Sequence, residues 1–330
     1  MPAKKHHYVP VFYQKGFADT DNMLWVYDRK LQRYKQLHPI VVCRSEDLYT
    51  VRQEGGTNDR RIETDILSPI ESAAAPVVRK LAPGVTRNPV ELVALMMFIS
   101  LQYTRLPSFG RAVSSLVEMT GNEMMQMQFG TLERARRTLA NYEREMGAPL
   151  TDDAAGMVEA VNSGHVRAHA NETGFLRYMF EIASTLESGL EQADWTVLTA
   201  PKTSGFIVCD HPFVTVPKQG TVPDGVGYGI PGTTCYFPLT RDICLMFRQG
   251  DEGFRHRRLD SREVRTINHN VAANSDRFVM GSDLTQLEAV VKKSGCEGLE
   301  TGERFSIEII EENEDSRYTK FTNLPRRYFY

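Results

Sequence analysis

A long block of helical sequence pattern, from about residue 60 to about residue 190, separates two β-rich ends of this chain. Apolar residues recur at helical spacing inside the block, whereas the two ends contain short apolar runs bounded by turn residues. Strands followed by helices and then by strands again predict an α+β fold rather than a doubly wound α/β fold. We therefore expect an inserted helical subdomain over about 60–191 and a β-containing subdomain formed by 1–59 plus 192–330, all within one unit.

Local signals predict the boundaries of several elements. Ser68-Pro69-Ile70-Glu71 and Asn88-Pro89-Val90-Glu91 each provide an N-cap residue, a proline at the first helical position and a glutamate in the first turn. Two apolar runs, Leu24 to Tyr27 and Tyr34 to His38, flank a polar stretch and predict a hairpin, with a further strand over Ile40 to Cys43. The other expected helices are 108–128, 131–146, 165–191, 261–274 and 284–293, and the other expected strands are 195–198, 205–209, 213–216, 234–237, 243–247, 277–280 and 305–310.

Length, charge and cysteine usage exclude some classes of protein. With 330 residues and a net charge of -3, the chain is not a basic protein that coats nucleic acid by bulk charge. Its longest strongly apolar stretch, Val90 to Leu101, is too short for a membrane-spanning helix, which needs about 20 residues. No apolar run of a secretory signal follows the N-terminal lysines, and the five cysteines include no Cys-x-x-Cys pair. We therefore expect a cytoplasmic protein with reduced thiols and no membrane association.

Five short strings in the sequence are typical of one family. They are Lys5 to Pro10 (Lys-His-His-Tyr-Val-Pro), Gln102 to Pro107, Phe206 to Pro212, Phe237 to Thr240, and Asn268 with Arg277 to Val279. Together they resemble the bacterial domain-of-unknown-function family 4238 over about residues 5–283. The resemblance implies a bacterial or phage-associated context and no particular reaction. This chain has Cys209 and His211 where the family pattern has serine and asparagine.

Two of these strings contain groups suited to acid–base or metal chemistry. His6 and His7 precede an extended segment, in which neighbouring side chains point to opposite sides, and either imidazole can act as a general base near neutral pH. Arg105 can hold a phosphate through two parallel hydrogen bonds. The candidate catalytic residues are therefore His6, His7, Arg105 and Asp210. The candidate ligands of a divalent metal ion that would activate water are His7, Asp210 and His211.

The same residues also have structural interpretations. A carboxylate such as Asp210, between a strand and Pro212, commonly accepts backbone N–H groups in a turn. Arg105 at the end of a helix suits the helix dipole and can pair with a buried acid such as Glu63 or Glu71.

The N-terminal segment is expected to dock rather than to form a domain of its own. It contains five apolar or aromatic residues that can pack on the C-terminal β region: Tyr8, Val9, Phe12, Tyr13 and Phe17. That packing would bring His6 or His7 near Asp210 in one cleft, with the glycine-rich loop Gln219–Gly232 lying over it.

The leading hypothesis is a phosphodiester-cleaving hydrolase, a nuclease of a bacterial defence or toxin type that uses a His/Asp site. The sequence contains no His-Glu-x-x-His, P-loop, Gly-x-Ser-x-Gly or Rossmann fingerprint that would support a commoner enzyme class. The alternatives are a component of a larger complex and a non-catalytic binding or sensor module. Such a module would contact a phage protein, a nucleotide or a peptide through the 219–232 loop and Met124, Met125 and Met127. Nucleic acid and a phage or host protein are thus the expected partners, and the oligomeric state stays open.

Overall fold

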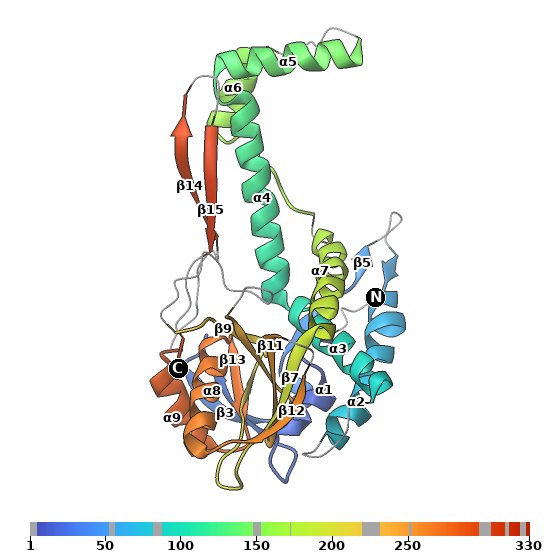
Figure 1. Ribbon diagram of the computed structural model, residues 1–330. Helices are drawn as coiled ribbons and strands as arrows, with labels where there is room; N and C mark the ends of the chain where they lie inside the picture. The colour runs from blue at the N-terminus through green and yellow to red at the C-terminus, as the bar shows by residue number, and fades with distance from the viewer. Residues whose placement is uncertain are drawn as a thin grey trace. The chain divides into compact units, whose positions relative to one another are not determined.

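The computed structural model describes residues 5–52, 57–81, 88–147, 153–171, 173–219, 232–250, 253–296, 305–313, 317–323 and 328–330 (Figure 1). The chain forms an α+β fold with two compact units. Unit 1 comprises Met1–Gly110, Leu176–Thr301 and Pro325–Tyr330, and unit 2 comprises Arg111–Phe175 and Gly302–Leu324.

The larger sheet of unit 1 has five strands in the order β12-β7-β11-β10-β9. Neighbouring strands are antiparallel except for β12 and β7, which are parallel. The strands are β7 Ala193–Thr199, β9 Val214–Val216, β10 Thr234–Pro238, β11 Ile243–Gln249 and β12 Phe254–Arg258. Only β12 was not predicted, because Phe-Arg-His-Arg-Arg lacks an apolar face and a strand at the edge of the sheet does not need one.

The second sheet of unit 1 combines strands from the N-terminal part of the chain with strands from its C-terminal part. Its order is β3-β2-β13-β8, formed by Arg33–Leu37, Leu24–Asp28, Phe278–Gly281 and Val208–Cys209. The predicted hairpin is confirmed, with Tyr27 opposite Tyr34. The predicted strand Ile40–Cys43 is wrong, because Pro39–Val41 forms a short 3-10 helix η2 in which the His38 side chain accepts a hydrogen bond from the Ile40 N–H. The next strand, β4 Arg44–Glu46, pairs with β1 Lys5–His7, and a separate short pair is formed by β5 Val51–Arg52 and β6 Asn58–Asp59.

Helices cover these sheets. They are α1 Val11–Gln14, the 3-10 helix η1 Lys15–Phe17, α2 Ser68–Lys80, α3 Pro89–Thr104, α7 Gly174–Glu191, α8 Ser261–Ala273 and α9 Leu284–Ser294. The Asn88 side chain caps α3 as predicted, by accepting from the Val90 N–H. Ser68 is not a cap, because a π-helical turn, Ile62–Leu67, already precedes it and its hydroxyl donates to the Glu63 carbonyl.

The N-terminal segment packs into the core of unit 1, as predicted. The Tyr13 ring stacks on Phe237 at 5.4 Å, and its hydroxyl donates to the Pro238 carbonyl. Phe98 of α3 contacts both rings, so this helix shares a core with the sheets. The division into units therefore differs from the expected boundaries near 60 and 191: α2, α3 and nearly all of α7 belong with the β-sheets because they bury their apolar faces against them.

Unit 2 contains helices and one hairpin. Its elements are α4, which begins in unit 1 and spans Pro107–Phe129, α5 Leu132–Met146, α6 Ala154–Asn162, β14 Phe305–Glu312 and β15 Arg317–Asn323. The helix expected over 165–191 begins only at Gly174, and α6 and β15 were not predicted.

Ion pairs join this hairpin to the helices of unit 2, where Figure 1 shows it beside α4. Arg317 binds Glu123 of α4 at 2.8 Å, and Glu312 binds both Arg317 at 2.9 Å and Arg134 of α5 at 3.2 Å. Glu312 is therefore paired with two arginines.

Two further observations concern the whole described chain. Within the described residues, no single helix is long and apolar enough to cross a membrane, whereas α3 and α4 satisfy length and composition only when taken together across the bend between them. All five cysteines are buried, and none of them forms a disulfide bond.

Candidate functional site

The two N-terminal histidines occupy different surroundings. The buried His6 ring stacks on Tyr49 at 5.5 Å, and its Nδ1 accepts a hydrogen bond from the Tyr49 N–H at 3.1 Å. His7 is half-buried, and its Nε2 lies 2.9 Å from the Ile40 carbonyl oxygen. Because a carbonyl only accepts, this contact requires the proton on Nε2. The opposite directions of the two side chains follow from their adjacency on β1.

Arg105 is the centre of a buried polar cluster at the C-terminal end of α3. Its Nη1 donates to Glu71 at 2.7 Å and its Nη2 to the His7 carbonyl at 2.6 Å. The Tyr49 hydroxyl in turn donates to the Arg105 carbonyl at 2.8 Å. Burial alone would lower the pKa of Arg105, but its interactions with Tyr49 and Glu71 raise it above the usual value. The guanidinium therefore joins α2, α3 and β1, and a phosphate would have to displace Glu71 to bind it.

Asp210 connects β8 to the loop between α8 and β13. Its carboxylate accepts the backbone N–H groups of Asp276 at 2.9 Å and Arg277 at 2.8 Å, and its own N–H donates to the Phe278 carbonyl. Burial, followed by the negative charge of Asp276, raises the pKa of Asp210 to about 7. Asp210 also contributes to the raised pKa of Tyr8, after burial and Cys43. Tyr8 is thus the residue of the N-terminal segment that interacts with Asp210. The rings of His6 and His7 instead contact Tyr49 and the Ile40 carbonyl.

His211 does not complete a three-ligand set with His7 and Asp210. Its ring lies 5.7 Å from the Tyr103 ring, and its carbonyl accepts from Asn274 at 2.6 Å. Within the part of the chain that the structure describes, no group of three or more His, Cys, Asp or Glu side chains is placed to hold a metal ion. The proposed ligands therefore do not form a preassembled metal site here.

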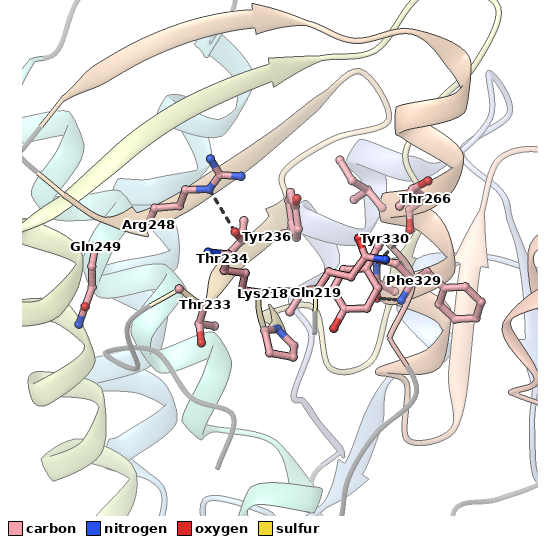
Figure 2. A pocket seen from close by; sticks show the side chains of 15 residues that line it. Lys218, Gln219, Thr233, Thr234, Tyr236, Arg248, Gln249, Thr266, Phe329 and Tyr330 are labelled. Carbon is pink, nitrogen blue, oxygen red and sulfur yellow. Dashed lines mark hydrogen bonds between the residues drawn. The ribbon is translucent and has the colours of Figure 1, made fainter. Parts of the chain in front are cut away.

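A pocket of about 500 Å³ lies in unit 1 between the β10–β11 strands and α8 (Figure 2), and we call it the β10–α8 pocket. Thr234 and Tyr236 are two residues apart on β10 and so share a face of the sheet, and Arg248 of β11 lies opposite Thr234. The residues that line the pocket are Val216, Pro217, Lys218, Gln219, Gly232, Thr233, Thr234, Tyr236, Arg248, Gln249, Thr266, Ile267, Asn270, Phe329 and Tyr330. Gln219 and Gly232 are the two end residues of the glycine-rich loop that was expected to lie over a cleft at Asp210, and its residues 220–231 lie outside the described residues.

The pocket is cationic. Lys218 and Arg248 line it, and none of its described lining residues is an aspartate or a glutamate. The Arg248 Nε donates to the Thr234 hydroxyl at 3.1 Å, which orients the guanidinium, and its two Nη groups have no protein partner within the described residues. Burial, followed by Cys244, raises the pKa of Tyr236, while the positive charges of Arg248 and Arg257 oppose that shift. The cationic side chains that line the pocket are suited to an anionic ligand.

The last described segment forms one wall of the pocket. Asn270 of α8 is buried, and its side-chain amide donates to the Phe329 carbonyl at 2.7 Å and accepts the Phe329 N–H at 2.9 Å. The Phe329 ring lies 5.2 Å from the His269 ring. These contacts hold the adjacent Tyr330 at the pocket.

Sequence patterns did not identify the β10–α8 pocket. Lys218 and Arg248 each follow a predicted strand by one or two residues, which is a signal that many surface cations share. The pocket exists because the antiparallel order of β9, β10 and β11 places these strand ends beside α8.

Family comparison agrees with the resemblance seen in the short strings. The family model described as "Protein of unknown function (DUF4238)" matches residues 5–285. The chain belongs to this family. Part of this DUF4238 protein is also similar to one subunit of the Na(+)-translocating NADH-quinone reductase of Alcanivorax borkumensis, with 23% identity over 168 residues, which cover 44% of this chain and 35% of that protein. The match thus spans about a third of the relative's length. No solved structure matches the chain.

Proposed function

We propose that this DUF4238 protein is a binding module, and that the β10–α8 pocket of unit 1 binds a small anionic ligand. The observation behind the proposal is that Lys218 and Arg248 line a pocket of about 500 Å³ with no Asp or Glu side chain in its described lining. A volume of about 300–1,000 Å³ is usual for small-molecule sites.

Arg248 supplies the recognition chemistry in this proposal. Its Nε is already bound to Thr234, so the two Nη groups are oriented and can donate in parallel to a phosphate or a carboxylate. The hydroxyls of Thr233 and Thr234 and the amides of Gln219 and Gln249 add uncharged hydrogen-bonding groups around the same space.

Titration with inorganic pyrophosphate and phosphate, followed by isothermal calorimetry, tests this function. Arg248→Gln should weaken binding by about 10-fold to 100-fold, the usual loss for a hydrogen bond to a charged group. Arg262→Gln is the matched control, because Arg262 is exposed on α8 and does not line the pocket. Equal losses in both variants, or no binding by the wild-type protein, would refute the proposal.

Phosphodiester hydrolysis stays a prediction. Its candidate residues are Arg105, His6, His7 and Asp210, and each of their side chains makes contacts that join backbone segments. Because these contacts already give the four side chains a role in stabilising the fold, they favour the binding module over the nuclease. A nuclease assay on single- and double-stranded substrates with added divalent metal ions would decide between the two.

A cytoplasmic location is part of the same proposal. The five cysteines are buried and form no disulfide bonds, which suits a reducing compartment. Quantifying free thiols in protein that is denatured immediately after cell lysis would test it.

A further inference from the structure

The two ends of the β10–α8 pocket differ in chemistry. Figure 2 shows Arg248, Thr233, Thr234 and Lys218 grouped on one side, and Tyr330, Phe329 and Thr266 on the other. A ligand that fills both ends therefore needs an anionic group and a flat apolar group. Simple phosphate would use only the first end.

The aromatic end depends on Tyr330. Tyr330 is 54% exposed, although the residue before it, Phe329, both accepts a hydrogen bond from the buried Asn270 side chain and donates one to it. The hydrogen bonds between Asn270 and Phe329, rather than burial of the Tyr330 ring, therefore hold this segment in place. An exposed aromatic ring that is fixed beside a cavity is suited to stacking against a planar ligand.

Tyr236 contributes a second aromatic group. It projects from β10 on the same sheet face as Thr234, and Arg248 lies opposite Thr234. In the view of Figure 2, Tyr236 lies between Arg248 and Tyr330. Its phenol hydroxyl and the Thr266 hydroxyl can form hydrogen bonds with the edge of a ring or with a sugar.

We infer that the ligand of the β10–α8 pocket is a mononucleotide, with its phosphate at Arg248 and Lys218 and its base stacked at Tyr330. This inference rests on the proposed anion-binding function and specifies its ligand class. In this arrangement different residues recognise the phosphate and the base. A substitution can therefore remove one of the two interactions and leave the other intact.

Calorimetric titration with three kinds of probe tests the inference. The probes are inorganic pyrophosphate, the four common nucleosides and their 5′-monophosphates. A monophosphate should bind more tightly than both pyrophosphate and its own nucleoside. Tyr330→Ala should weaken the monophosphate by about fivefold or more, the loss of one stacked base, and leave pyrophosphate unchanged. Arg248→Gln should weaken both ligands.

Two controls separate stacking from damage to the fold. Tyr330→Phe retains the ring and should bind like the wild-type protein, and Tyr178→Ala removes another exposed tyrosine, on α7, that does not line the pocket. Both variants and Tyr330→Ala should keep the wild-type melting temperature.

The outcomes distinguish the two proposals. If pyrophosphate binds through Arg248 but no monophosphate binds more tightly, or Tyr330→Ala changes nothing, the nucleotide inference is overturned and the anion-binding function stands. If neither pyrophosphate nor any monophosphate binds, both are overturned.

Discussion

Replacing Asp210 with asparagine should change how the stability of unit 1 depends on pH. The Asp210 carboxyl is buried next to the charge of Asp276, and its pKa is raised from 3.8 to about 7. In the native protein the group therefore holds its proton over a range of pH in which the unfolded chain has already released it. That difference stabilises the native state below the unfolded pKa and is lost as pH rises through the folded pKa.

The size of the effect follows from the shift. Three units of pKa correspond to about 4 kcal/mol in the free energy of unfolding, and this figure is an upper value for a carboxyl that also accepts two backbone hydrogen bonds. Asp210→Asn removes the titration. Its amide can accept only one of the two backbone N–H groups, which adds a cost of about 1–3 kcal/mol at every pH. The wild-type protein should therefore be the more stable of the two at about pH 5, and its advantage should shrink toward about pH 8.

Urea denaturation monitored by tryptophan fluorescence is a suitable assay. Both tryptophans of the chain, Trp25 and Trp195, lie in unit 1 with Asp210, so the signal reports the unit that contains the substitution. Asp276→Asn is the matched variant: it removes the neighbouring charge and should make the pH dependence shallower. A stability difference between wild type and Asp210→Asn that stays constant or grows with pH would refute the reasoning, because it would mean that the backbone hydrogen bonds to the ionised carboxylate outweigh burial.

Three other predictions follow from the polar contacts. Glu71→Ala leaves the buried guanidinium of Arg105 without its carboxylate and should lower the free energy of unfolding by about 3 kcal/mol in urea titrations, with Glu71→Gln intermediate; an unchanged midpoint would contradict this. Asn270→Ala removes both hydrogen bonds to Phe329, so hydrogen exchange at the Phe329 amide should accelerate, whereas Asn270→Asp, which retains the acceptor, should protect that amide better. Under the nuclease hypothesis, His7→Ala should abolish cleavage while lowering the free energy of unfolding by only about 1 kcal/mol, the loss of one hydrogen bond to the Ile40 carbonyl, and full cleavage by this variant would remove His7 from the mechanism.

The fold could be predicted in outline wherever the signals were local. The Asn88 cap and the hairpin around Asp28 were both expected, and so was the helix over 261–274, which the structure places at Ser261–Ala273. Errors arose where a neighbouring element decided the conformation. Ser68 resembled a helix start, but the chain was already helical before it, and β12 lacked an apolar pattern because it lies at a sheet edge.

The site residues illustrate the same limit. From the sequence, Glu71 and Glu63 were equally possible partners of Arg105. Only the packing of α2 on α3 brings the Glu71 carboxylate to 2.7 Å from the Arg105 Nη1. The sequence also predicted that the N-terminal segment packs against the C-terminal strands. It did not indicate that Tyr8 would interact with Asp210 and that His6 would stack on Tyr49.

Local sequence signals were sufficient to predict the α+β class, the docking of the N-terminal segment and the cap of α3. Helix caps, hairpins and apolar periodicity depend on residues within a few positions of one another, so a single sequence contains them. Which charges are neutralised, and which face a cavity, depends instead on how the elements pack. Lys218, Arg248 and Tyr330 are far apart in the chain and meet because strand order and the Asn270 contact bring them to one pocket. No local sequence pattern predicts that these three residues lie close together, because the packing that brings them together is stabilised by the burial of other residues.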